Sequence, residues 1–177
     1  MNVQVKSVVA KIKKDSRLLR LHNAFNDLPY YNLHVEELYD EIKRLHKLRL
    51  IRTMKPSDRD YVKKLVEASA QDQSTRSRLS EIRITTIKAV RSLESAVSSL
   101  KDYLIVEYST DLSFVRTKGE RENIIDTLLS KYKKYIDAVN SVSEQCLVVI
   151  EDIDKAAWSL KLQLDALQMT NRPERSI

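Results

Sequence analysis

The chain has 177 residues, of which 42% are hydrophobic and 32% charged, and its formal net charge is +6. This length suits one domain or one domain with an extension, and the hydrophobic share is too high for a disordered chain. No apolar run reaches the roughly 18 residues of a membrane span, and the first residues lack the apolar core of a secretory signal. The one cysteine, Cys146, cannot form an internal disulfide. We therefore expect no membrane contact and a cytoplasmic location.

The basic residues are concentrated in the N-terminal third. Residues 1–64 carry a net charge of +7, and residues 65–177 carry −1. A polyanion would be attracted to the first segment. A solvated lysine-rich surface is the alternative explanation for this asymmetry.

The first two predicted helices precede Pro56. Residues 1–27 predict one helix with a loose apolar row, which ends at the turn signal of residues 26–29. A second helix is predicted from Asn32, a favourable N-cap residue, and it carries an apolar row before it stops at Pro56. Basic residues fill its later turns, where they favour the negative end of the helix dipole.

The third predicted helix begins at Pro56, with Ser57 or Asp58 as its cap. Residues 67–78 contain no large apolar side chain, so this stretch is either an exposed helical section or a break. Beyond it, apolar residues step by three and four, as in the heptads of a coiled coil. This row consists of Val90, Leu93, Val97, Leu100 and Leu104.

The final predicted helix follows a connection at residues 109–119, which ends on Gly119, the one glycine of the chain. Its apolar row is the longest regular pattern in the sequence, with a stutter near its end. The row consists of Ile125, Leu128, Tyr132, Tyr135, Val139, Val142, Cys146, Val149 and Ile153. A second apolar row on the same helix indicates more than one neighbour, either the N-terminal helices or other subunits.

These patterns predict an all-α protein in which short N-terminal helices precede a long antiparallel two-helix hairpin that resembles a coiled coil. The expected regions are a basic helical region at 1–55, a hairpin at 56–170 with helices 56–108 and 119–170, and a tail at 171–177. The two rows named above, without Cys146, are the candidate assembly core of a homo-oligomer. A heptad row fits a hairpin closed within one chain and one exchanged between chains equally well.

The sequence offers little for catalysis, so we expect a protein that is not an enzyme and needs no metal or cofactor. No cysteine or carboxylate joins His22, His34 and His46 at zinc-ligand spacing. His34 and Glu37 form an i, i+3 pair that could hold a metal, although surface pairing is the simpler interpretation. Glu151 and Asp154 could share one helix face and hold a divalent metal, although a solvated face is the simpler interpretation. Cys146 falls at a core position, which favours a buried hydrophobe over a nucleophile.

Several aromatic residues are candidate stacking platforms for bases. Tyr132 and Tyr135 lie in the apolar row, which favours core packing. Tyr30 and Tyr31 stand in a turn beside the basic helices, where stacking on nucleic acid is plausible. Trp158 lies one position beyond the row, and we expect it to fill an interface.

The candidate nucleic-acid-binding residues are the lysines and arginines that follow the start of the second helix. Their contacts with phosphates would release counterions and make binding sensitive to salt. The set consists of Lys43, Arg44, Lys47, Arg49, Arg52, Lys55, Arg59, Lys63 and Lys64.

The organisation of the chain resembles that of bacteriophage DNA-handling proteins. Small terminase subunits pair a basic helical DNA-binding region with a helical hairpin that assembles into a ring, a layout that would map onto residues 1–55 and 79–168. Phage recombination mediators, which are small helical oligomers bound to single-stranded DNA, are similar too. The tracts at residues 116–121 and 149–154 look like family signatures without identifying a family.

The leading hypothesis is a non-enzymatic, oligomeric DNA-binding protein that loads or positions another protein machine on DNA. The alternative is a structural helical adaptor or virion subunit, whose basic region would meet an acidic protein surface. A third hypothesis, an enzyme, would need a metal at Glu151 and Asp154.

Overall fold

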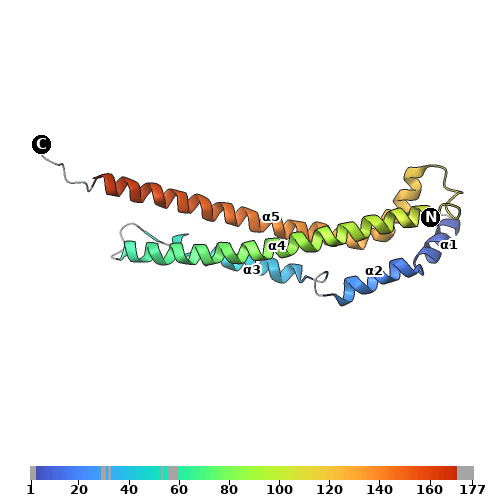
Figure 1. The fold of residues 1–177 in the computed structure, drawn as a ribbon, viewed down its shortest axis with the longest axis horizontal. Helices are drawn as coiled ribbons and strands as arrows, with labels where there is room; N and C mark the ends of the chain where they lie inside the picture. Colours follow the sequence, from blue (N-terminus) through green and yellow to red (C-terminus); the bar gives the residue numbers. More distant parts are fainter. Residues whose placement is uncertain (1–2, 29–30, 32, 53, 56–59, 171–177) are drawn as a thin grey trace, which may run out of the picture. The chain divides into compact units, whose positions relative to one another are not determined.

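A computed structural model describes residues 3–28, 31, 33–52, 54–55 and 60–170, with the backbone alone at residues 3, 52, 163, 164 and 166–170. Every regular element in this part of the chain is helical (Figure 1). The elements are α1 (Val3–Ile12), α2 (Ser16–Asp27), α3 (Val35–Lys47), the 3-10 turn η1 (Leu50–Arg52), α4 (Tyr61–Glu107) and α5 (Lys118–Thr170). The predicted all-α fold with its long hairpin is confirmed.

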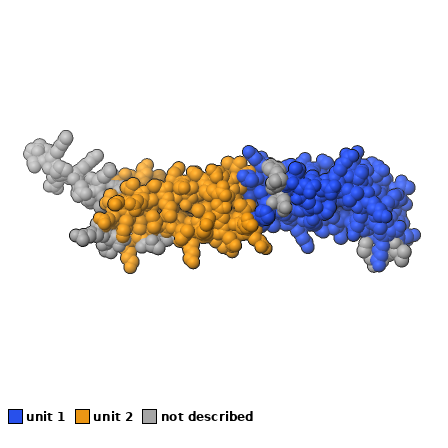
Figure 2. Space-filling view, turned by 90° about the horizontal axis from the view of Figure 1, so that it is seen from below, with its two compact units in different colours: residues 1–35, 85–142 blue, residues 36–84, 143–177 orange. Residues whose placement is uncertain are grey.

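The chain divides into two units, each assembled from two separate stretches of sequence (Figure 2). Unit 1 comprises residues 1–35 and 85–142, and unit 2 comprises residues 36–84 and 143–177. Helices α4 and α5 contribute to both units. The sequence boundary expected at residue 55 therefore does not separate the two units.

Unit 1 contains α1, α2 and the loop end of the hairpin. Its core joins apolar residues of all four helices, and it includes Ile12, Leu104, Ile125 and Leu129, which are fully or almost fully buried. The connection between α4 and α5 takes part in this core through Leu112 and Val115. The loop is thus held by the same apolar burial that holds the helices.

The predicted single helix over residues 1–27 is wrong, because the chain breaks at Asp15. The Asp15 carboxylate accepts hydrogen bonds from the backbone N–H groups of Arg17 and Leu18, at 2.8 and 3.3 Å, and so caps α2. The hydroxyls of Tyr108 and Tyr103 donate to its other oxygen at 3.0 and 3.2 Å. These bonds turn the chain so that both α1 and α2 bury apolar residues in unit 1.

Unit 2 contains α3, η1, the first half of α4 and the second half of α5. Residues 67–78 are helical, which resolves the alternative left open by the sequence. Small and polar side chains of this stretch, Ala68, Asp72 and Thr75, are buried. The stretch is therefore partly buried although it has no large apolar side chain.

The helix starts predicted before α3 and α4 differ from those found. Helix α3 begins at Val35, and the proposed cap Asn32 lies outside the described residues. Helix α4 begins at Tyr61, and Ser57 and Asp58 also lie outside the described residues. Helix α5, at Lys118–Thr170, agrees with the predicted 119–170 to within one residue.

Candidate nucleic-acid interface

The last two turns of α3 present basic side chains to solvent. The helix buries Ile42 on one face and half-buries Leu38 and Leu45 beside it, so the opposite face is exposed. Lys43, Arg44 and Lys47 lie on this exposed face. The Lys43 ammonium lies 4.0 Å from Oδ1 of Asp40. A contact at that distance between exposed groups is weak and would not prevent Lys43 from binding a phosphate.

Further candidates stand at the start of α4 and just before it. Lys55, Lys63 and Lys64 are exposed. Arg59 lies outside the described residues, and the side chain of Arg52 does too. Six of the nine candidate side chains are therefore accessible surface cations in unit 2.

Arg49, which the sequence predicts as a nucleic-acid contact, does not belong to this surface. Its side chain is 1% exposed. Its Nε and Nη2 donate to the two carboxylate oxygens of Asp72 at 2.8 and 2.7 Å, and its Nη1 donates to Asp152. The bonds to Asp72, against the opposing effect of burial, raise the pKa of Arg49. Arg49 is a buried link between η1, α4 and α5.

The backbone around Arg49 is fixed by a second contact with α4. The Gln71 amide accepts a hydrogen bond from Leu50 N–H at 2.9 Å and donates to the Leu48 carbonyl at 3.2 Å. One glutamine thus satisfies two backbone groups at the junction of α3 and η1. This arrangement aims the Arg49 side chain inward.

Two more ion pairs and one contact between a histidine and an aspartate connect the helices of unit 2. Arg78 of α4 donates to both oxygens of Glu41 on α3, at 2.7 and 3.1 Å. Arg76 of α4 donates to both oxygens of Asp154 on α5, at 2.8 and 3.2 Å. His46 lies 3.3 Å from Asp152. Sequence reasoning missed these pairs, since partners up to 106 residues apart leave no local signal.

Asp154 and Glu151 are engaged in ion pairs. The bond from Arg76 lowers the pKa of Asp154, and Lys155 approaches Glu151 to 4.0 Å. Within the described ranges, no group of three or more histidine, cysteine or acidic side chains is arranged to hold a metal ion. The two carboxylates therefore act as surface partners of basic residues in this structure.

The aromatic candidates divide between core and surface. Tyr132 is buried and Tyr135 is half-buried, and the Phe25 ring meets both edge to face at 5.2 and 4.9 Å between centroids. Tyr31 is half-buried, and its hydroxyl lies 2.7 Å from that of Ser92; Tyr30 lies outside the described residues. Trp158 is 62% exposed.

The candidate assembly core lies inside the chain. Val90, Leu93, Val97, Leu100 and Leu104 of α4 are all buried, as are Ile125, Tyr132, Val139, Val142, Val149 and Ile153 of α5, while Leu128 and Tyr135 are half-buried. Both apolar rows are therefore occupied by contacts within one chain. Cys146 is buried with them, and burial raises the pKa of its thiol to about 11.

No protein-family model matches the chain, and neither the curated proteins nor the solved structures include a significant match. None of the helices in the described part of the chain has a stretch that is long and apolar enough to cross a membrane.

Proposed function

We propose that the protein is a non-enzymatic DNA-binding protein that positions another protein machine on DNA. The observation that carries this proposal is the group of exposed cations on unit 2, which we call the basic surface: Lys43, Arg44, Lys47, Lys55, Lys63 and Lys64. Its role would be similar to that of a phage small terminase subunit or recombination mediator. It would act in the host cytoplasm or within a virion.

The chemistry of the basic surface suits a phosphate backbone. Lysine and arginine side chains that neutralise phosphates release condensed counterions, which makes affinity fall steeply with salt. Each contact is independent of base identity, so the surface would position the protein on DNA without selecting a sequence. Sequence choice would then come from the partner machine.

The test compares two triple charge reversals that change the net charge equally. Lys43→Glu/Arg44→Glu/Lys47→Glu alters the basic surface, and Lys88→Glu/Lys118→Glu/Lys134→Glu alters exposed lysines of unit 1. Fluorescence anisotropy with labelled single-stranded and double-stranded DNA, at several salt concentrations, reports binding. We expect the first variant to lose at least about tenfold in affinity and about three units of salt slope. The control should bind within about threefold of the natural protein.

Normal DNA binding by the first variant would contradict the proposal. An equal loss in both variants would also contradict it, because binding would then follow total charge and not the basic surface. Circular dichroism and size-exclusion chromatography of both variants would establish that fold and assembly are unchanged. Preference for one strand form would choose between the mediator and terminase roles.

A structural adaptor is the second candidate, and the distribution of exposed apolar residues favours it. In the described chain, nine of the twelve exposed large hydrophobic side chains belong to unit 2. They are Leu48, Leu50, Val62, Val66, Ile84, Leu147, Val148, Trp158 and Leu162. Exposed apolar side chains that gather in one region are typical of protein interaction surfaces. A complete lack of DNA binding at low salt would leave the adaptor as the better explanation.

A further inference from the structure

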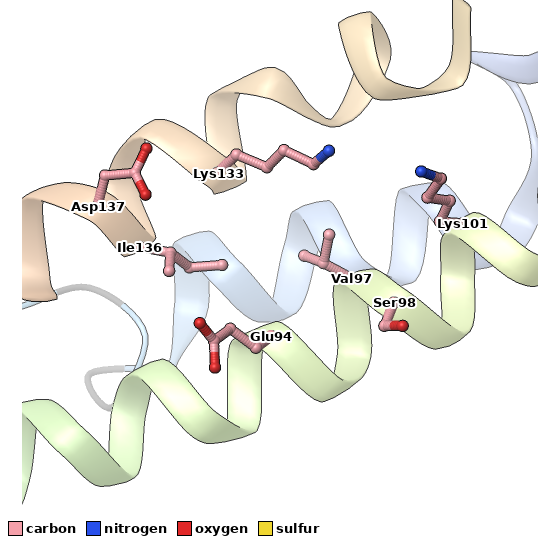
Figure 3. A pocket seen from close by; sticks show the side chains of 7 residues that line it. All are labelled: Glu94, Val97, Ser98, Lys101, Lys133, Ile136 and Asp137. Carbon is pink, nitrogen blue, oxygen red and sulfur yellow. The ribbon is translucent and has the colours of Figure 1, made fainter. Parts of the chain in front are cut away.

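A cavity of about 400 Å³ opens between α4 and α5 in unit 1 (Figure 3). Glu94, Val97, Ser98 and Lys101 line it from α4, and Lys133, Ile136 and Asp137 line it from α5. Its volume lies within the range of small-molecule sites, which is about 300–1,000 Å³. None of these polar residues takes part in the basic surface.

One end of the cavity carries two ammonium groups that share a single carboxylate. The Nζ atoms of Lys101 and Lys133 each lie 3.0 Å from Oδ1 of Asp126. Burial raises the pKa of Asp126, but these two ammonium groups outweigh it and hold that pKa below its usual range. Two positive charges against one negative charge leave an excess positive charge at this end.

The positive end is partly shielded from water. The side chains of Lys101, Lys133 and Asp126 are 26%, 44% and 30% exposed. Each lysine ammonium has three donor hydrogens, and Asp126 cannot accept them all from both groups. Figure 3 shows the two lysine side chains extending toward each other from different helices. A tetrahedral anion between them could accept hydrogen bonds from both directions.

The other end of the cavity is acidic, with an apolar section between the two ends. Glu94 and Asp137 contribute their carboxylates there, from α4 and α5 respectively, at the end away from the lysine ammonium groups (Figure 3). Val97 and Ile136, which are 5% and 7% exposed, line the middle. A ligand that fits both ends must carry an anion and a cation separated by a short apolar spacer.

We propose that this cavity binds a small phosphorylated amine, with its phosphate at Lys101 and Lys133 and its ammonium at Glu94 and Asp137. The Ser98 hydroxyl lines the cavity and offers the phosphate a further donor. We favour phosphate over carboxylate because the two ammonium groups approach the ligand from different helices. A planar carboxylate is instead best matched by the planar guanidinium of an arginine. This proposal is independent of DNA binding.

The first experiment measures binding of three soluble probes by calorimetry: O-phosphoethanolamine, inorganic phosphate and ethanolamine. We expect saturable binding of O-phosphoethanolamine, with affinity about threefold to fivefold above that of phosphate, as one weak ion pair to the amine would give. Ethanolamine alone should not bind measurably. The absence of saturable O-phosphoethanolamine binding would overturn the proposal, and so would affinity equal to that of phosphate.

Variants assign the binding to the cavity. Lys133→Met should weaken O-phosphoethanolamine binding about tenfold, and Lys101→Met/Lys133→Met should abolish it, while Lys134→Met on the exposed face serves as the matched control. Glu94→Gln/Asp137→Asn should remove the preference over phosphate. The single lysine variant leaves Asp126 one ammonium partner, so it tests the site even where the double variant fails to fold. Unchanged binding in Lys133→Met would contradict the assignment.

A lipid headgroup can also carry phosphoethanolamine. Binding to vesicles therefore distinguishes a lipid from a soluble small molecule as the ligand. Sedimentation with vesicles of phosphatidylethanolamine and phosphatidylcholine should leave the protein in the supernatant. Co-sedimentation that disappears in Lys133→Met but persists in Lys134→Met would overturn the small-molecule form of the proposal.

Discussion

Arg49 is the residue whose position differs most from the one predicted from the sequence. It follows a run of exposed cations on α3, yet its guanidinium is buried between Asp72 of α4 and Asp152 of α5. A charge removed from water is costly unless it is paired in good geometry, and the two bonds to Asp72 provide that geometry. Asp72 is itself buried, so the stability of each group depends on the other.

Replacing Arg49 with methionine should lower the free energy of unfolding by about 3–5 kcal/mol, because the Asp72 carboxylate would remain buried without its partner. Urea unfolding followed by circular dichroism measures this change. Lys47→Met is the matched control, and we expect its effect to be below about 0.5 kcal/mol. The double variant Arg49→Met/Asp72→Asn should recover part of the loss, since no uncompensated charge remains at position 72. If the losses caused by Arg49→Met and by Asp72→Asn simply added up in the double variant, the pairing of these two residues would be contradicted.

Asp15 predicts a dependence of stability on pH. Burial raises its pKa, but hydrogen bonds from the backbone of Arg17 and Leu18 and from the hydroxyls of Tyr108 and Tyr103 together lower it below the usual value for an aspartate. A carboxyl whose pKa is lower in the folded state stabilises the fold above its unfolded pKa, and this contribution is lost as pH falls through the folded value.

The stability advantage of the natural protein over Asp15→Asn should therefore be constant above about pH 5 and shrink below about pH 4. Thermal unfolding of both proteins between pH 7 and pH 3 tests this expectation. Asp27→Asn, at an exposed position near the end of α2, is the control. A difference that does not change with pH would show that the charge of Asp15 does not matter.

At the level of elements, α4 illustrates what local patterns can and cannot determine. The heptad row predicts the second half of α4, because large apolar residues at steps of three and four mark the face of a helix that is buried. Residues 67–78 gave no such signal, since Ala68 and Thr75 can be buried or exposed with little cost. The break at Asp15 does have a local signal, since aspartate is a favourable N-cap residue and its Oδ1 caps α2. The hydroxyls of Tyr103 and Tyr108, about ninety residues away, bind its other oxygen and leave no such signal in the sequence.

The burial of Ala68 leads to a prediction about the stability of α4. Ala68 is fully buried, whereas Ala70 on the same turn is exposed. Ala68→Leu should destabilise unit 2 by about 1–3 kcal/mol, because the added isopropyl group has no space at this buried position. Ala70→Leu introduces the same side chain and should change the free energy of unfolding by less than about 0.5 kcal/mol. Equal effects of the two substitutions on the urea midpoint would show that residue 68 is not tightly packed.

At the level of the whole molecule, the extent of self-association depends on which apolar residues remain outside the core. Both predicted assembly rows are filled by contacts within the chain, so two copies that each fold in this way would have to associate through other residues. Sequence could identify the rows but not their occupant, because a heptad pattern is satisfied by either an internal or an external partner. We propose that any homo-oligomer forms through exposed apolar residues of α5, including Val148, Trp158 and Leu162.

Val148→Lys/Leu162→Lys should accordingly shift the protein to monomer, as measured by analytical ultracentrifugation over a range of concentrations. Helicity should be preserved, because both side chains are more than half exposed. Leu19→Lys, which changes an exposed leucine of unit 1, is the control and should leave association unchanged. Oligomers of unaltered size in the double variant would exclude this face of α5.

The division of each unit between two distant stretches of sequence has a consequence for biosynthesis. Unit 1 needs residues 85–142 to complete the partners of α1 and α2, and unit 2 needs residues beyond 143 to cover α3. Translation at about 5–20 residues per second therefore leaves α3 and the first half of α4 without α5 for several seconds after they are made. During that interval Asp72 and Arg49 have only each other, and the nascent chain exposes apolar surface that a chaperone could recognise. Folding of unit 2 is thus tied to the completion of α5 and cannot be finished by the N-terminal half alone.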